Sequence, residues 1–178
     1  MLYPFSETGR LQQGKLSRQT ILHTWSASVK KKKLATLARK GRSIRQVGAL
    51  PYRRTEDGAL TFMLVTSRET GRFIIPKGWP MKDRSKSKAA EIEAMEEAGV
   101  VGRTGPLLGS FNYWKRLKKV FVPIIVDVYP IEVVEERDDW KERKRRRRAW
   151  LTADQAARLV DEPELVSLLK DAEAALTA

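Results

Sequence analysis

Three glutamates near the middle of the chain have the type and spacing needed for divalent-metal chemistry. Glu93, Glu96 and Glu97 occupy positions i, i+3 and i+4 of a helical pattern over residues 88–98. In an α-helix this spacing places the carboxylates on one face, with Cβ atoms about 5–6 Å apart. Mg²⁺ binds carboxylate oxygens and takes substrate phosphates as further ligands. The pattern indicates phosphate chemistry, with a solvated acidic face as the common alternative.

The neighbouring sequence must hold this helix beside a turn and a sheet. Pro76 and Gly78 mark the turn, Ser85 or Ser87 caps the helix, and Gly99 ends it. Runs of apolar and β-branched residues predict strands, and caps predict two later helices. The expected strands are 46–53, 60–66, 72–76, 107–113, 120–129 and 150–151, and the later helices are 152–160 and 163–175. This order predicts an α+β layered domain.

The net charge of +13 is concentrated at the N-terminus. Residues 1–45 contain eleven Lys and Arg against one acid, whereas the remainder contains 24 against 21. Such charge favours polyanionic partners: nucleic acid, membrane surfaces or phosphorylated small molecules. We therefore expect a basic, flexible N-terminal arm over 1–40 and a folded domain over 41–178. The arm's composition also suits a transit peptide, and the sequence leaves that alternative open.

Residue types that are scarce or missing exclude several kinds of site. The chain has no cysteine and one histidine, His23, which lies in the arm. Disulfides, thiolate zinc sites and Ser–His or Cys–His nucleophiles are therefore excluded. The lack of cysteine fits a reducing compartment, so we expect a cytoplasmic protein. No apolar run approaches the length of a membrane span.

The turn and the helix together resemble the signature of the Nudix hydrolase family. That signature is Gly, five residues, Glu, seven residues, Arg-Glu, two residues, Glu-Glu, one residue and Gly. In this chain it reads Gly78, five residues, Arg84, seven residues, Ile92-Glu93, Ala94, Met95, Glu96-Glu97, Ala98 and Gly99. The two departures are Arg84 and Ile92, at positions where the family has a Glu and an Arg that brace the loop and helix. Glu91 is a candidate partner for Arg84.

The resemblance covers about residues 45–160. Within the family it points to the diphosphoinositol-polyphosphate and diadenosine-polyphosphate hydrolases and to bacterial relatives with Pro-Lys-Gly-Trp-Pro. The stretches that carry it are Ile75-Pro76-Lys77-Gly78, Leu108-Gly109-Ser110-Phe111, Asp139-Trp140 and Arg146-Arg147-Arg148-Ala149-Trp150-Leu151. It implies an α/β/α sandwich with a mixed sheet, the signature helix and C-terminal helices.

The resemblance also implies a set of site residues. Glu93, Glu96 and Glu97 are the expected catalytic residues, and with Gly78 they are the expected ligands of Mg²⁺ or Mn²⁺. The expected substrate-binding residues are Arg45, Ser67, Arg68, Lys77, Gly78, Arg116, Lys118 and Arg147. The general base stays open among Glu93, Glu135, Glu136, Asp138 and Asp139.

The function implied is Mg²⁺-dependent hydrolysis of phosphoanhydride bonds in diphosphoinositol polyphosphates or dinucleoside polyphosphates. One alternative is an RNA 5′-pyrophosphohydrolase, with the basic arm binding nucleic acid. The other is a non-catalytic binding protein with the same fold. The oligomeric state is not predicted.

Overall fold

Two strands with long apolar runs form the centre of the sheet. In the computed structural model, which describes residues 36–37, 39–117 and 120–177, β1 (Ile44–Arg54) lies parallel to β7 (Val120–Glu136). The pairing runs from Ile44 opposite Ile124 to Tyr52 opposite Glu132. Strands of a parallel pair are usually covered on both faces, which explains why both runs are apolar rather than alternating.

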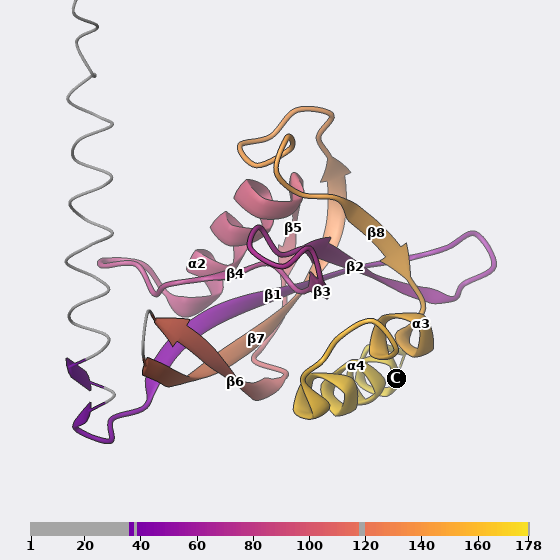
Figure 1. Cartoon of the computed structure of the whole chain (residues 1–178). Helices are drawn as coiled ribbons and strands as arrows, with labels where there is room; N and C mark the ends of the chain where they lie inside the picture. Colours follow the sequence, from indigo (N-terminus) through magenta and orange to yellow (C-terminus); the bar gives the residue numbers. More distant parts are fainter. Residues whose placement is uncertain (1–35, 38, 118–119, 178) are drawn as a thin grey trace, which may run out of the picture.

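The other strands pair around these two (Figure 1). The core order is β3-β2-β1-β7-β5, and every pairing besides β1–β7 is antiparallel. Strands β6 and β5 pair with the first and last parts of β7, β4 pairs with β1, and β8 pairs with β2. Their bounds are β2 (Leu60–Thr66), β3 (Phe73–Ile74), β4 (Lys77–Gly78), β5 (Val100–Thr104), β6 (Gly109–Leu117) and β8 (Arg148–Leu151).

Helices cover both faces of the sheet. On one face lies α2 (Lys86–Glu93), continued by a π-helical turn, η1 (Ala94–Ala98), whose alanines pack on residues such as Val47 and Met63. On the other face α3 (Ala153–Ala157) and α4 (Pro163–Thr177) pack on residues such as Phe62 and Phe111. The predicted α+β sandwich is therefore confirmed.

Several predicted bounds are wrong. Strands β4 and β5 were not expected, and β7 continues to Glu136 because β5 pairs with its last part across a bulge at Val101 and Gly102. The signature helix starts at Lys86, with Ser85 as its cap, and its last turn is π rather than α. There the N–H of Gly99 donates to the carbonyls of Ala94 and Met95.

The predicted arm over 1–40 lies almost entirely outside the described residues, so its flexibility stays a prediction. In the part of the chain that the structure does describe, no helix is both long and apolar enough to cross a membrane.

A buried carboxylate anchors the start of α2 to the sheet. Asp127 on β7 is 2% exposed and accepts hydrogen bonds from Arg45 (2.5 Å), Lys86 (2.8 Å) and Ser110 (2.9 Å). Burial alone would raise the pKa of Asp127, but the hydrogen bonds from Lys86 and Ser110 and the charges of Lys86 and Arg45 outweigh it. The pKa of Asp127 therefore lies below its ordinary value.

We predict that Asp127→Asn lowers the free energy of unfolding at pH 7 by about 2 kcal/mol, the usual size for hydrogen bonds to a charged group. Because the folded-state pKa is depressed, the wild-type contribution is present above the ordinary aspartate pKa of about 4 and is lost as the pH falls through the folded-state pKa. Urea unfolding at pH 7 and pH 3 should show the difference between the two proteins shrinking at pH 3. The exposed Asp138→Asn is the matched control, and an equal loss in both variants would contradict the assignment.

Candidate active site

The turn before α2 is held against the sheet by β4. Lys77 and Gly78 pair with Gly48 and Val47 of β1, so the turn cannot move away from the sheet without breaking backbone hydrogen bonds. A Cβ added at Gly78 would overlap the carboxylate of Glu93. The absence of a side chain at Gly78 therefore lets the Glu93 carboxylate lie directly on the turn.

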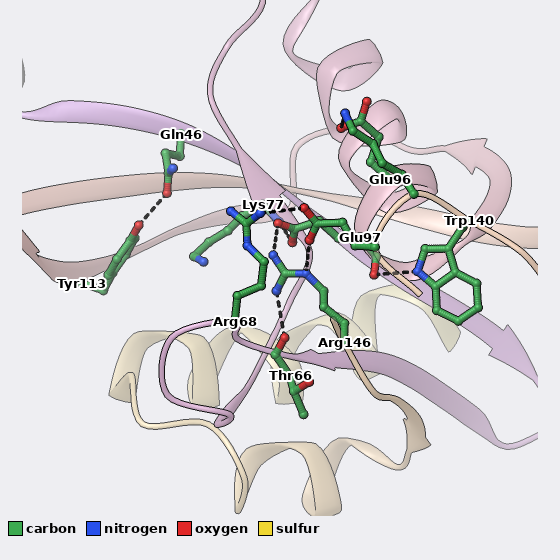
Figure 2. Close-up of polar contacts among 11 residues, drawn as sticks. Gln46, Thr66, Arg68, Lys77, Glu96, Glu97, Tyr113, Trp140 and Arg146 are labelled. Atoms are coloured by element: carbon green, nitrogen blue, oxygen red, sulfur yellow. Dashed lines mark hydrogen bonds and ion pairs between the residues drawn. The ribbon is translucent and has the colours of Figure 1, made fainter. Parts of the chain in front are cut away.

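Glu97 is the most buried of the three signature glutamates, with 8% of its surface exposed. Its Oε2 accepts a hydrogen bond from the backbone N–H of Lys77 at 3.1 Å, and its Oε1 accepts one from the guanidinium of Arg146 (Figure 2). Burial raises the pKa of Glu97 even though the charges of Arg146 and Lys77 lower it. The indole N–H of Trp140 donates to the Glu97 carbonyl at 3.2 Å, which fixes the backbone of η1 as well.

Arg146 connects three parts of the chain through one buried guanidinium. Its side chain is 6% exposed, and besides Glu97 it donates to Glu142 Oε2 (2.5 Å) and to the carbonyl of Thr66 (2.8 Å). Figure 2 shows the guanidinium between Thr66 and Glu97. Arg146 thereby ties the loop before β8 to the end of β2 and to η1.

Glu96 and Glu93 differ in their partners. Glu96 forms an ion pair with Lys141 at 2.6 Å, whereas Glu93 has no hydrogen-bond or ion-pair partner among the described residues. Burial, with the charges of Glu97 and Glu96, raises the pKa of Glu93 to about 7. Excess negative charge of this kind is what a bound cation relieves.

The three carboxylates do not converge as placed. Among the residues that the structure describes, no group of three acidic or histidine side chains is arranged to hold a metal ion. Arg146 and Lys141 each form an ion pair with one of these carboxylates, and the turn that carries Glu96 and Glu97 is π rather than α. The predicted α-helix through residue 98, on which the i, i+3, i+4 spacing depends, is therefore wrong in its last turn.

The signature glutamates and many cations nevertheless line one cavity of about 470 Å³. Of the residues expected from the sequence it contains Ser67, Arg68, Lys77, Gly78, Glu93, Glu96, Glu97 and Arg116. Among the five candidates for the general base, Glu93 alone lines it. The glutamates and aspartates of 135–139 do not.

Two expected substrate-binding residues that the structure describes, Arg45 and Arg147, are not in this cavity. The guanidinium of Arg45 donates to Asp127 instead, because β1 and β7 bring the two side chains together on the α2 face of the sheet. Arg147 lines a neighbouring cavity, which also contains Ser67 and Arg68. Lys118 lies outside the described residues. Glu91 is also not the partner of Arg84, since it accepts from Lys88 (2.5 Å) and Thr104 (2.7 Å).

Several charged cavity residues were not among the expected site residues: Glu69, Arg72, Lys115, Glu142 and Arg146. The run 143–148 indicated basic character, but nothing in it distinguishes the buried Arg146 from its exposed neighbours. Lys77 was expected, yet not its environment. Its ammonium lies 5.3 Å from the centre of the Tyr113 ring, and burial lowers its pKa to about 8 against the opposing charge of Glu97.

Comparison with known proteins gives sequence relatives from plants that are named Nudix hydrolases, and an animal phosphohydrolase. The chain is 33% identical over 116 residues to Nudix hydrolase 18, mitochondrial, and 32% identical over 122 residues to Nudix hydrolase 16, mitochondrial, both from Arabidopsis thaliana. These matches cover 62% and 61% of this chain and 65% and 68% of the relatives. Diphosphoinositol polyphosphate phosphohydrolase 2 from Rattus norvegicus is 29% identical over 109 residues, which is 60% of this chain and 58% of that protein.

The chain thus spans less than two thirds of several curated relatives that it matches. No protein-family model matches it. Among solved structures, the Caenorhabditis elegans Ap4A hydrolase in a binary complex superposes with a TM-score of 0.57 at 20% identity, over 75% of this chain and 97% of that one. At 20% identity this match shows a shared fold and nothing about activity.

We predict that Arg146→Gln lowers the free energy of unfolding by about 3 kcal/mol, because removing one partner of a buried ion pair leaves the other charge uncompensated. Glu97 would lose its ion-pair partner, whereas Glu142 would keep its pair with Arg68. Thermal or urea unfolding measures the effect. Arg145→Gln, one residue earlier and exposed, should change stability by less than about 0.5 kcal/mol. Equal effects would show that Arg146 is no more than a surface charge.

Proposed function

The chain belongs to the Nudix hydrolase family, and on this basis we propose that it hydrolyses phosphoanhydride bonds in polyphosphorylated small molecules with a divalent metal ion. The observation that carries the proposal is the shared cavity. Three signature glutamates line it together with six cations: Arg68, Arg72, Lys77, Lys115, Arg116 and Arg146. A polyphosphate needs charge-assisted donors from several directions, and arginine offers two parallel donors to each phosphate.

We propose Mg²⁺, or Mn²⁺ in its place, on Glu93, Glu96, Glu97 and the carbonyl of Gly78. The donor chemistry fits, because these are hard oxygen ligands and Glu93, which has no partner among the described residues, lies in the space that a Gly78 side chain would fill. Such an ion, when bound, neutralises phosphate charge and polarises the attacking water.

The chain's own residues then have distinct tasks. Glu96 would leave Lys141 at little cost to hold the metal, since an exposed ion pair contributes at most about 1 kcal/mol. Arg146 and the Lys77 N–H hold Glu97 in one orientation. The ammonium of Lys77 stabilises negative charge that develops on the departing phosphate. Glu93 is our choice for the general base, as the one candidate that lines the cavity.

For the substrate we propose diphosphoinositol polyphosphates or dinucleoside polyphosphates. The second cavity, about 520 Å³ in volume and lined by Arg68, Arg143, Lys144, Arg145 and Arg147 among others, adjoins the first through residues common to both. This arrangement offers cations beyond those needed for two phosphates. The name of the rat phosphohydrolase agrees with the first substrate class, and that of the nematode Ap4A hydrolase agrees with the second.

We propose the cytoplasm as the location of the protein, and the one observation behind this proposal is that the sequence contains no cysteine. The names of both plant relatives described above carry the word mitochondrial, so cell fractionation is the test.

Replacement of Glu93 tests the proposed catalytic role. Glu93→Gln keeps the shape of the side chain and removes its charge, so turnover should fall by at least about a hundredfold through loss of a metal ligand and base. Stability without metal should be unchanged or slightly raised, because repulsion by Glu96 and Glu97 is relieved. Hydrolysis of a diadenosine polyphosphate at saturating Mg²⁺ is the measurement. The control is Glu91→Gln in the same helix, whose carboxylate pairs with Lys88 and Thr104. Full activity of Glu93→Gln would refute the assignment.

Replacement of Arg68 and Arg147 tests whether the site prefers substrates with more than two phosphates. If Arg68 and Arg147 contact phosphates beyond the scissile pair, Arg68→Gln with Arg147→Gln should raise KM for a diphosphoinositol polyphosphate by about tenfold or more, as expected for a lost charged hydrogen bond of at least ~1.5 kcal/mol. A nucleoside diphosphate sugar should be nearly unaffected, because it has only two phosphates. Arg158→Gln, on the exposed end of α3, controls for net charge. Equal losses for both substrates would place these arginines at the scissile group instead.

A further inference from the structure

One surface of the sheet combines exposed aromatic rings with arginines, and we call it the aromatic face. Its members are Arg45 on β1, Trp114 and Arg116 on β6, and Phe121 and Pro123 on β7. Trp114 lies opposite Pro123 and Arg116 opposite Phe121, while Arg45 lies opposite Ile125. Because side chains alternate along a strand, these residues share one face, and Tyr113, Lys115 and Ile124 point to the other.

The aromatic face is the part of the α2 side of the sheet that α2 does not cover. The helix begins at Lys86, whose ammonium reaches Asp127, and the strands continue beyond that contact to Phe121 and Trp114. Trp114 is 68% exposed and Phe121 is 61% exposed. Rings this large are normally buried, so two of them exposed on neighbouring strands indicate a binding surface.

The charge of the aromatic face is positive. Asp127 is buried beside it and is already matched by both Arg45 and Lys86. Arg116 has no acidic partner among the described residues. The sequence that leads into Arg45 is also basic, with eight Lys and Arg between residues 30 and 45.

We propose that the aromatic face binds a single-stranded nucleic acid, with bases stacked on Trp114 and Phe121 and phosphates held by Arg45 and Arg116. Bases of every kind stack on aromatic rings, and nearby cations hold the backbone that joins them. A second copy of this chain fits less well, because a two-fold contact would bring the same arginines of both copies together.

The position of the aromatic face connects it to the proposed active site. Trp114 and Arg116 also line the cavity that contains the signature glutamates. A strand bound on the face could therefore bring its terminal phosphates to that cavity. This link rests on the proposed hydrolase function, whereas binding to the face does not.

Binding of a fluorescent RNA oligonucleotide to the full chain tests the proposal. An oligonucleotide of roughly ten residues, within the usual site sizes, and with a 5′-monophosphate offers no anhydride to hydrolyse. Fluorescence anisotropy should show affinity lowered about tenfold by Trp114→Ala and by Phe121→Ala, and largely kept by Trp114→Tyr, which can still stack. Val134→Ala, which alters a side chain that is equally exposed (61%) at the far end of β7, is the matched control and should bind as the wild type does.

Three results would overturn the proposal. The first is unchanged RNA affinity in both alanine variants, which would assign binding to another basic part of the chain. The second is equal weakening by Val134→Ala. The third is self-association of the wild type that Phe121→Ala abolishes in analytical ultracentrifugation, which would make the face a contact between copies. Turnover of a diadenosine polyphosphate by Phe121→Ala should equal that of the wild type. This activity measurement therefore tests the hydrolase proposal independently of RNA binding.

Discussion

The contact on which the site depends is the packing of the alanine face of α2 and η1 against the sheet. Ala89, Ala90, Ala94 and Ala98 are fully buried on β1, β2 and β7. Their small side chains let the helix approach closely, and they leave the acidic residues on the side that borders the cavity. A larger residue at any of these positions would push the helix away and move all three carboxylates together.

The second constraint is that the same space must hold both negative and positive charge. Glu97 is buried, and burial without a partner would favour its neutral form. That partner is Arg146, which lies 49 positions after Glu97 in the sequence. Its guanidinium also donates to Glu142 and to the Thr66 carbonyl. In the Nudix signature the bracing Glu and Arg are replaced here by Arg84 and Ile92. A guanidinium from outside the signature fixes one of its glutamates instead.

Acidic and basic groups lie close together in the cavity. Glu93 lies on Gly78 with no partner among the described residues, and its excess negative charge suits a cation. Arginines and lysines come from the loop after β2, from β4, from β6 and from the loop before β8. The proposed metal and phosphates would meet between these groups, and the aromatic face continues from Trp114 and Arg116, which also line the cavity. In the proposed function, catalysis and binding of a longer substrate would therefore depend on neighbouring but different residues.

The sequence by itself determined the kind of fold and the residues of the signature, because both depend on local rules. Strand β2 and the Gly99 stop follow from residue type and spacing alone, whereas the structure was needed to choose Ser85 over Ser87 as the cap. The tertiary structure decided which charges meet. Arg45 faces Asp127 because two distant strands pair in one register, and Arg146 is buried while Arg145 is not because one loop folds back onto η1. Short β4 and β5 exist only through their partners, β1 and β7. Ion pairs between residues tens of positions apart leave no periodic trace in a sequence, so one chain read alone cannot predict them.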